Sequence, residues 1–168
     1  MQTDYYTKIL LQRSKDININ LSDTQITQIF CYIENLQKWN KTYNLTAITK
    51  TEDIIEYHII DALQIVKYLD KFENILDVGT GAGIPGIILA IYNPNRKITL
   101  IDKSNKKVKF LKHVCHQLNL DPKLITSMHT KIQESKPIPN HANNFDAIIS
   151  RAVTQIEPFE IIASKLLS

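Results

Sequence analysis

All four glycines of this 168-residue chain fall within eight positions, in the run Gly79-Thr80-Gly81-Ala82-Gly83-Ile84-Pro85-Gly86. The run follows the apolar segment Ile75–Val78, which is typical of a short buried strand. Glycine lets the backbone turn sharply and lets a ligand approach the main chain closely. Because a strand precedes the loop and a helical pattern follows it, the loop amides would face that ligand. The pattern predicts a cofactor-binding loop.

An acidic residue ends the next apolar segment. Asp102 lies 21 residues beyond Gly81, directly after the strand-like run Ile98–Ile101. A carboxylate at that place accepts hydrogen bonds from ribose hydroxyls. The order of strand, glycine turn, helix, strand and acid therefore predicts an adenosine-containing cofactor.

Asp77, just before the glycine loop, helps to distinguish between two such cofactors, NAD and S-adenosylmethionine. A carboxylate would repel the pyrophosphate of NAD, whereas it would attract the ammonium and sulfonium groups of S-adenosylmethionine. We therefore expect S-adenosylmethionine as the cofactor. An NAD(P)-dependent oxidoreductase stays open as an alternative, although the chain leaves little room for the substrate domain it would need.

The residues after the fourth expected strand narrow the chemistry. Ser150-Arg151 stands where amine methyltransferases have an Asn/Asp-Pro-Pro-aromatic turn, and no cysteine or acidic cluster lies nearby. Arg151 can donate to guanine O6 or hold a phosphate; it can also close the cofactor pocket or pair with an acid. Guanine N7 has an in-plane lone pair that attacks a methyl group without prior deprotonation, so we expect no catalytic base.

The charge is unevenly distributed. The net charge is +3, but Arg96–Lys112 alone carries +6, which leaves −3 for the rest of the chain. A local basic segment favours a polyanionic partner, although a solvated helix face would look the same.

Several classes of protein and site are not expected. The first residues do not resemble a signal peptide, and the longest uncharged stretch holds all the glycines, so we expect a cytoplasmic protein that does not enter the membrane. Cys31 and Cys115 cannot form a disulfide framework. His113, Cys115 and His116 lack a fourth ligand, so we expect no metal site.

The elements that must position these residues change character near residue 70. The first 70 residues have helical periodicity: Ser22 is a good N-cap for a helix through Leu36, Lys38–Lys50 is typical of a connector, and Thr51 is a cap for a second helix. Residues 71–168 alternate strands and helices, which predicts a doubly wound parallel sheet. We expect strands at Ile75–Val78, Ile98–Ile101, Leu124–Ser127 and Phe145–Ser150, helices at Ile84–Tyr92, Asn105–Leu118 and Gln155–Leu167, and a loop at Lys131–Asn144.

Taken together, these residues resemble the glucose-inhibited division protein B family, bacterial 16S ribosomal RNA guanine-N7 methyltransferases with a class I, Rossmann-like fold. The Trp-Asn-Lys and Asn-Leu-Thr pairing is the family-specific part; the glycine loop is shared by many methyltransferases. The matching pieces are Lys38–Lys41, Asn44–Thr46, His58–Asp61, Asp77–Gly86, Asp102, Lys106–Leu111 and Ile149–Ala152.

The resemblance implies a site for each partner. The S-adenosylmethionine pocket would include Gly79, Ile84, Ile132, Gln133 and Arg151, together with Asp77, Gly81, Gly83 and Asp102 from the loop pattern. The 16S ribosomal RNA of the small subunit would contact Arg151, Trp39, Lys103, Lys106 and Lys107, and no obligate protein partner is inferred. Trp39 would stack on a base, or else pack within the protein.

The sequence also departs from the family. Gln133, Ala62 and Tyr57 stand where glutamate, serine and arginine are usual. Class I methyltransferases resemble one another in a seven-stranded sheet of order 3-2-1-4-5-7-6, and only four strands are evident, so we expect the C-terminal strands to be missing. A non-catalytic RNA-binding protein that keeps the fold therefore remains a further alternative.

Overall fold

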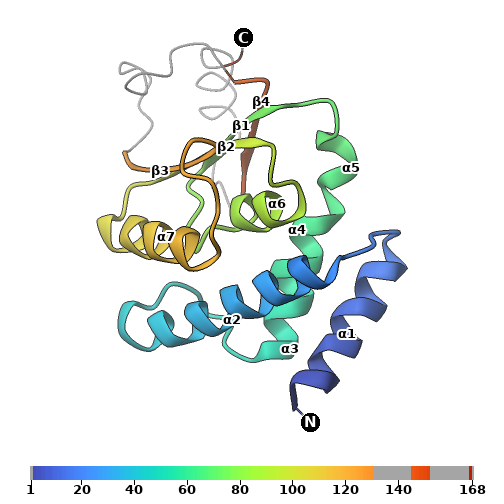
Figure 1. Ribbon diagram of the computed structural model, residues 1–168. Helices are drawn as coiled ribbons and strands as arrows, with labels where there is room; N and C mark the ends of the chain where they lie inside the picture. The colour runs from blue at the N-terminus through green and yellow to red at the C-terminus, as the bar shows by residue number, and fades with distance from the viewer. Residues whose placement is uncertain (1, 131–144, 152–166, 168) are drawn as a thin grey trace.

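The computed structural model describes residues 2–130, 145–151 and 167 (Figure 1). A helical N-terminal part precedes a parallel sheet with helices packed against it. The elements are α1 (Gln2–Asp16), α2 (Asp23–Tyr43), α3 (Thr51–Ile54), the π-helix η1 (Ile55–Ile60), α4 (Asp61–Gln64), α5 (Val66–Leu69), β1 (Asn74–Val78), α6 (Gly86–Tyr92), β2 (Lys97–Asp102), α7 (Asn105–Gln117), β3 (Ile125–His129) and β4 (Ala147–Ser150).

The four strands form one parallel sheet in the order β3-β2-β1-β4. Asp77 of β1 is in register with Leu100 of β2 on one side and Ile149 of β4 on the other. The chain moves outward from β1 through β2 to β3, and then returns to the other side of β1 at β4. Such a reversal opens a crevice beyond the carboxyl ends of β1 and β4, where open α/β sheets bind ligands.

Helix α2 begins as the sequence predicts. The Ser22 side chain accepts a hydrogen bond from the Gln25 amide, and the Gln25 side chain accepts one from the Ser22 amide, which makes a capping box. The helix continues to Tyr43, so the expectation that a connector starts at Lys38 was wrong. It ends at Asn44, whose φ of 49° is a left-handed conformation that asparagine tolerates.

The second expected helix is interrupted. Its N-cap is Lys50 rather than Thr51, which is the first helical residue. Residues Ile55–Ile60 form a π-helix between α3 and α4. A periodicity of 3.6 residues does not distinguish these wider turns from an α-helix, so they were not predictable from the sequence.

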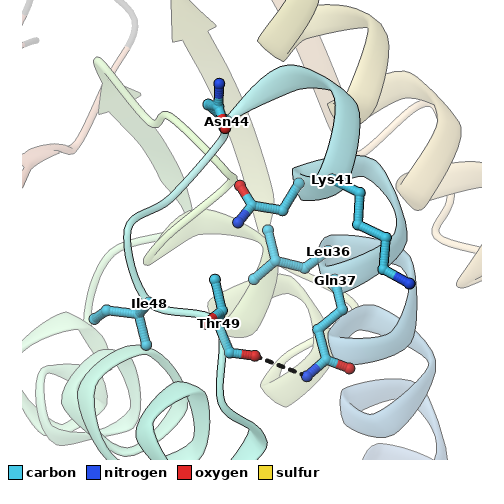
Figure 2. A pocket seen from close by; sticks show the side chains of 7 residues that line it. Leu36, Gln37, Lys41, Asn44, Ile48 and Thr49 are labelled. Atoms are coloured by element: carbon cyan, nitrogen blue, oxygen red, sulfur yellow. Dashed lines mark hydrogen bonds between the residues drawn. The ribbon is translucent and has the colours of Figure 1, made fainter.

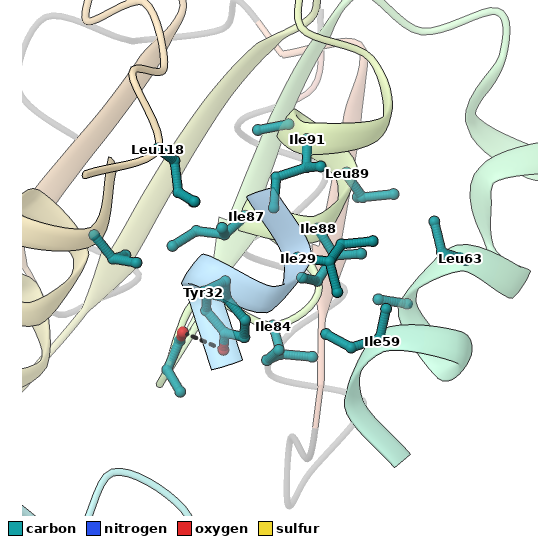
Figure 3. Close-up of a cluster of buried hydrophobic side chains, with 14 of the residues drawn as sticks. Ile29, Tyr32, Ile59, Leu63, Ile84, Ile87, Ile88, Leu89, Ile91 and Leu118 are labelled. Carbon is teal, nitrogen blue, oxygen red and sulfur yellow. Dashed lines mark hydrogen bonds between the residues drawn. The ribbon is translucent and has the colours of Figure 1, made fainter. Parts of the chain in front are cut away.

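A single cluster of buried side chains joins the two parts of the chain. Figure 3 shows Ile29 and Tyr32 of α2 and Ile59 and Leu63 of η1 and α4 packed with residues around α6. Helices α6 and α7 cover one face of the sheet, and α2 packs against both (Figure 1). A smaller cluster of Leu76, Ile101 and Phe145 forms separately. The division into domains 1–70 and 71–168 stays a prediction.

Three boundaries near the glycine loop and the C-terminus need correction or stay untested. Helix α6 begins at Gly86, not Ile84, and Pro85 is its N-cap. Leu167 forms a parallel bridge with Phe145, so it does not end a helix as expected. The rest of that helix and the loop at 131–144 lie outside the described residues. The expectation that the C-terminal strands are missing stays a prediction. Among the described residues, no helix is long and apolar enough to cross a membrane.

Candidate functional site

The glycine loop lies at the carboxyl end of β1, on the crevice. Gly79, Gly81 and Gly83 have φ of 66°, 62° and 87°. A Cβ on Gly79 would meet no atom within 4 Å, so the space above this turn is open to a ligand. A Cβ on Gly86, in contrast, would collide with the Leu100 side chain and lie 2.7 Å from Oδ2 of Asp77. Gly79 therefore faces open space, whereas Gly86 faces the protein.

Asp77 holds the loop from beneath and is completely buried. Its Oδ2 accepts hydrogen bonds from the Thr80 hydroxyl (2.6 Å) and from the Gly86 amide (2.9 Å). Its Oδ1 is buried without a hydrogen-bond partner. Burial raises the pKa of Asp77 to about 6, although the bonds from Thr80 and Gly86 oppose the shift. The site thus contains one carboxylate oxygen that no group of the described protein satisfies.

Asp102 ties the glycine loop to the loop that follows β2. Its Oδ2 accepts from the Gly81 amide at 3.0 Å and its Oδ1 from the Ser104 amide at 2.8 Å. Nζ of Lys107 lies 4.0 Å from the same Oδ2. A carboxylate offers about four acceptor positions, so these contacts leave capacity for a ribose hydroxyl.

Tyr32 is a further support that the sequence did not reveal. Its ring is completely buried, and its hydroxyl donates a 2.9 Å hydrogen bond to the Ala82 carbonyl (Figure 3). Burial raises the pKa of Tyr32. An aromatic residue at helical spacing is typical of core packing, so no local pattern indicated that Tyr32 reaches the glycine loop.

Arg151, at the end of β4, is fixed by groups from the N-terminal helices. Its Nη2 donates to the Tyr57 carbonyl at 2.7 Å, and its Nη1 lies 3.1 Å from Nδ1 of His58. Nη2 is also 3.5 Å from Oδ2 of the exposed Asp61. Of the roles considered from the sequence, pairing with an acid is therefore present. Contacts of Arg151 with cofactor or base stay predictions.

The network behind Arg151 joins segments that the sequence analysis found separately. Nε2 of His58 is 3.0 Å from the Thr46 hydroxyl. The Asn40 side chain binds the backbone of Thr46 twice, accepting from its amide and donating to its carbonyl, both at 2.9 Å. The Trp-Asn-Lys, Asn-Leu-Thr, His-x-x-Asp and Ser-Arg segments thus meet through hydrogen bonds beside the crevice.

The basic segment is divided between two ends of the sheet, which corrects the single patch expected at Arg96–Lys112. Arg96 is 5% exposed and precedes β2, at the opposite end from the glycine loop. Lys103 and Lys106 are exposed at the start of α7, whereas Lys107 is half-buried and points toward Gly81. The exposed charge near the site therefore comes from Lys103 and Lys106, with Lys109 and Lys112 further along α7.

Four other expected site residues are not shown at the crevice by the described structure. Trp39 packs in an aromatic cluster with Tyr43, Phe110 and His113, with ring centroids 5.1–5.7 Å apart, which fits the packing alternative. The Ile84 side chain is buried in the core. Ile132 and Gln133 lie outside the described residues. Within the described part of the chain, no group of three metal-ligating side chains occurs.

Comparison with known proteins identifies the family. A family model described as GidB, rRNA small subunit methyltransferase G, matches residues 25–168. The chain belongs to this family. The GidB match agrees with the resemblance expected from the sequence and counts against an NAD(P)-dependent oxidoreductase.

Individual relatives agree with this assignment. The ribosomal RNA small subunit methyltransferases G of Francisella tularensis subsp. tularensis (strain WY96-3418) and of Francisella philomiragia are 38% and 39% identical to the chain. The alignments cover 94% and 91% of the chain and 72% and 71% of those GidB proteins.

Two solved structures share the fold. An S-adenosyl-L-methionine-dependent methyltransferase of Methanococcus maripaludis superposes with a TM-score of 0.56 at 22% identity, over 81% of this chain and 57% of that one. Coclaurine N-methyltransferase, bound to N-methylheliamine and SAH, superposes with a TM-score of 0.57 at 13% identity, over 99% and 56%. The chain thus has the Rossmann-like fold of class I methyltransferases, with a helical N-terminal extension, and spans little more than half the length of these two structures.

Proposed function

We propose that this chain binds S-adenosylmethionine at the glycine loop and transfers its methyl group to N7 of a guanine in 16S ribosomal RNA. Membership of the GidB family supports ribosomal RNA methylation, as do relatives named as small subunit methyltransferases. The structural observation that carries the proposal is the buried, unpaired Oδ1 of Asp77 beneath the loop.

The residues present fit this cofactor. A buried carboxylate oxygen without a partner is costly unless a donor reaches it, and the cofactor brings an ammonium group. The open space at Gly79 lets the cofactor approach the backbone, and Asp102 keeps acceptor capacity for the ribose. The two acids therefore serve the two ends of one ligand: Asp77 the amino acid end and Asp102 the nucleoside end.

When bound, S-adenosylmethionine supplies an electrophilic methyl group on a sulfonium. The protein then has to orient the guanine and exclude water, because N7 carries its own lone pair and needs no base. Arg151 has N–H groups beyond those that bind Tyr57 and His58, and a guanidinium donates well to guanine O6, the neighbour of N7. Such an arrangement would need no general base.

The RNA would approach along the first turn of α7. Lys103, just before the helix, and Lys106, in its first turn, are exposed next to Asp102 at the end of β2. Contacts of lysine with phosphate attract RNA without reading its sequence. Base selection would then depend on the crevice itself.

Two measurements, made one after the other, test the proposal. Calorimetric titration with S-adenosylmethionine, with NAD as the control, should give saturable binding of one molecule of S-adenosylmethionine only. Incubation with small ribosomal subunits and cofactor labelled in the methyl group should then put label on one guanine, at N7. Binding of cofactor and RNA without methyl transfer would instead favour the non-catalytic RNA-binding alternative. Failure of folded protein to bind S-adenosylmethionine would contradict the proposal.

A further inference from the structure

His58 is buried beside Arg151 and is bonded through both ring nitrogens. We propose that His58 is a positioning residue: in its neutral form, protonated on Nε2, it holds Arg151 at the carboxyl end of β4, while Asn40 and Thr46 hold His58. This inference rests on the proposed function for the role of Arg151. The position and the proton location of His58 are testable without it.

The contact between Arg151 and His58 favours one tautomer of the ring. Arginine has only donors, so the 3.1 Å contact between Nη1 of Arg151 and Nδ1 of His58 is a hydrogen bond only if Nδ1 is unprotonated. Nε2 then carries the proton and donates to the Thr46 hydroxyl oxygen at 3.0 Å. The Tyr57 carbonyl is also 3.1 Å from Nδ1; with Nδ1 unprotonated it receives no proton from the ring but still accepts from Nη2 of Arg151 at 2.7 Å. One assignment of protons therefore satisfies the arginine, the imidazole and the carbonyl together.

Thr46 is held in place by α2. Asn40 binds both the amide and the carbonyl of Thr46, and the Thr46 hydroxyl accepts from the Ile48 amide. Gln37, one turn earlier, donates to the Thr49 carbonyl at 2.9 Å, and Figure 2 shows this bond across a hollow of about 500 Å³ between α2 and the connector. The Thr46 hydroxyl, which accepts the hydrogen bond from His58, thus belongs to a segment that α2 holds at several points.

Arg151 keeps donors that have no partner among the described residues. Of the five N–H groups of a guanidinium, one faces His58 and two face Tyr57 and Asp61, so within the described part of the chain the Nε–H and one Nη1–H remain. A hollow of about 500 Å³ opens beside it, lined by Asp61, Pro85 and Ser150 among others. Some N–H groups of Arg151 are therefore held by the protein and others can donate to a ligand, which suits a group that orients a ligand.

The charges around His58 favour the neutral ring. Burial lowers its pKa first, and Arg151 lowers it further, whereas the Tyr57 carbonyl and Asp61 oppose the shift. Arg151, which follows β4, and Asp61 of α4 are the charged groups that act on His58, and Thr46, which bonds to Nε2, is neutral. Protonation of His58 would remove the acceptor and place two cations in contact.

The test compares substitutions that keep or remove the acceptor. His58→Asn places an amide oxygen near the position of Nδ1, whereas His58→Phe fills the space without an acceptor. We expect His58→Phe to lower the turnover number by between about tenfold and a hundredfold, as a misplaced orienting group does. His58→Asn should recover most of that loss. His116→Asn, at an exposed histidine of α7, is the matched control and should behave as the wild type.

A second readout does not need activity. The ¹⁵N chemical shifts of the His58 ring at pH 7 should show an unprotonated Nδ1 and a protonated Nε2, and Arg151→Ala should change the Nδ1 signal. Thr46→Val, which removes the acceptor of the Nε2 proton, should weaken that tautomer preference. A charged ring, or a proton on Nδ1, overturns the proposal whether or not any histidine variant folds poorly.

The outcomes separate the two proposals. If the wild-type chain neither binds S-adenosylmethionine nor methylates the subunit, the proposed function fails, while the ring shifts still decide the position of His58. If the wild type is active and His58→Phe equals His58→Asn in turnover, the positioning role is refuted although the function stands. A turnover loss that only the acceptor-bearing variant restores supports positioning over general packing.

Discussion

The hydroxyl of Tyr32 donates to the carbonyl of Ala82, 50 residues later, and so joins the middle of α2 to the glycine loop. Tyr32→Phe removes the donor and leaves a buried carbonyl unsatisfied. We expect a loss of about 1–3 kcal/mol in the free energy of unfolding, together with weaker S-adenosylmethionine binding. Urea denaturation and calorimetry measure the two effects. Tyr43→Phe, at an exposed ring of the same helix, should change neither; equal effects of the two substitutions would show that the bond to Ala82 is unimportant.

Asp77 should make stability and cofactor affinity depend on pH in opposite directions. Its pKa in the folded protein is raised from 3.8 to about 6, so the folded state holds the proton more tightly than the unfolded state does. The resulting stability is complete below about pH 4 and is lost as the pH rises through 6, by roughly 3 kcal/mol. Asp77→Asn should abolish this fall, measured as unfolding free energy at several pH values.

The ammonium group of the cofactor needs the charged carboxylate, so the affinity of the wild type for S-adenosylmethionine should instead rise as the pH passes 6. In Asp77→Asn the affinity should be weaker and largely independent of pH over this range. A pH-independent wild-type affinity would remove Asp77 from the ligand contacts and leave it as a support of the loop.

Asp102 should contribute to nucleoside binding. Asp102→Ala removes an acceptor for the ribose and releases the amides of Gly81 and Ser104. We expect S-adenosylmethionine to bind more weakly by about 1–3 kcal/mol in calorimetry. Asp70→Ala, an exposed acid that precedes β1, serves as the control and should bind normally. Unchanged affinity in Asp102→Ala would rule out this placement of the ribose.

The exposed lysines around the N-terminus of α7 should govern RNA binding. Replacing Lys103 and Lys106 with glutamate should weaken binding to small-subunit ribosomal RNA and flatten its dependence on salt, because fewer counterions are released. Filter binding across a range of salt concentrations measures both quantities. The same reversal at Lys71 and Lys97, at the opposite end of the sheet, should have little effect. If both pairs behave alike, binding reflects net charge and not a defined surface.

Local patterns were sufficient to predict the strands and the loop between them. The apolar runs before Gly79 and Asp102 are short and bounded by residues that end strands, so their type and order were correct. The Ser22 cap was predictable because a capping box involves only neighbouring residues. The glycine cluster indicated the turn, since three of its residues need positive φ.

Long-range contacts were not predictable in the same way. Tyr32 and His58 act on the site through hydrogen bonds to residues far along the chain, and a helical sequence pattern carries no trace of such partners. Arg96 was counted with the other basic residues because adjacency in sequence hides the fact that a strand separates the two ends of a sheet. The role of Asp102 in binding two backbone amides likewise depends on how two loops meet in space.

The continuous core around α2 has a consequence for how the molecule opens. Ile29 and Tyr32 pack with α6, and the Tyr32 hydroxyl donates a hydrogen bond to the glycine loop. Local unfolding of α2, which would expose its amides to solvent, would therefore also disturb the crevice. S-adenosylmethionine bound in that crevice would stabilise the folded state over the locally unfolded one. Hydrogen–deuterium exchange in α2 should therefore slow when S-adenosylmethionine is added, in step with exchange in α6, as in one cooperative unit. The N-terminal helices would thus report on the cofactor without touching it.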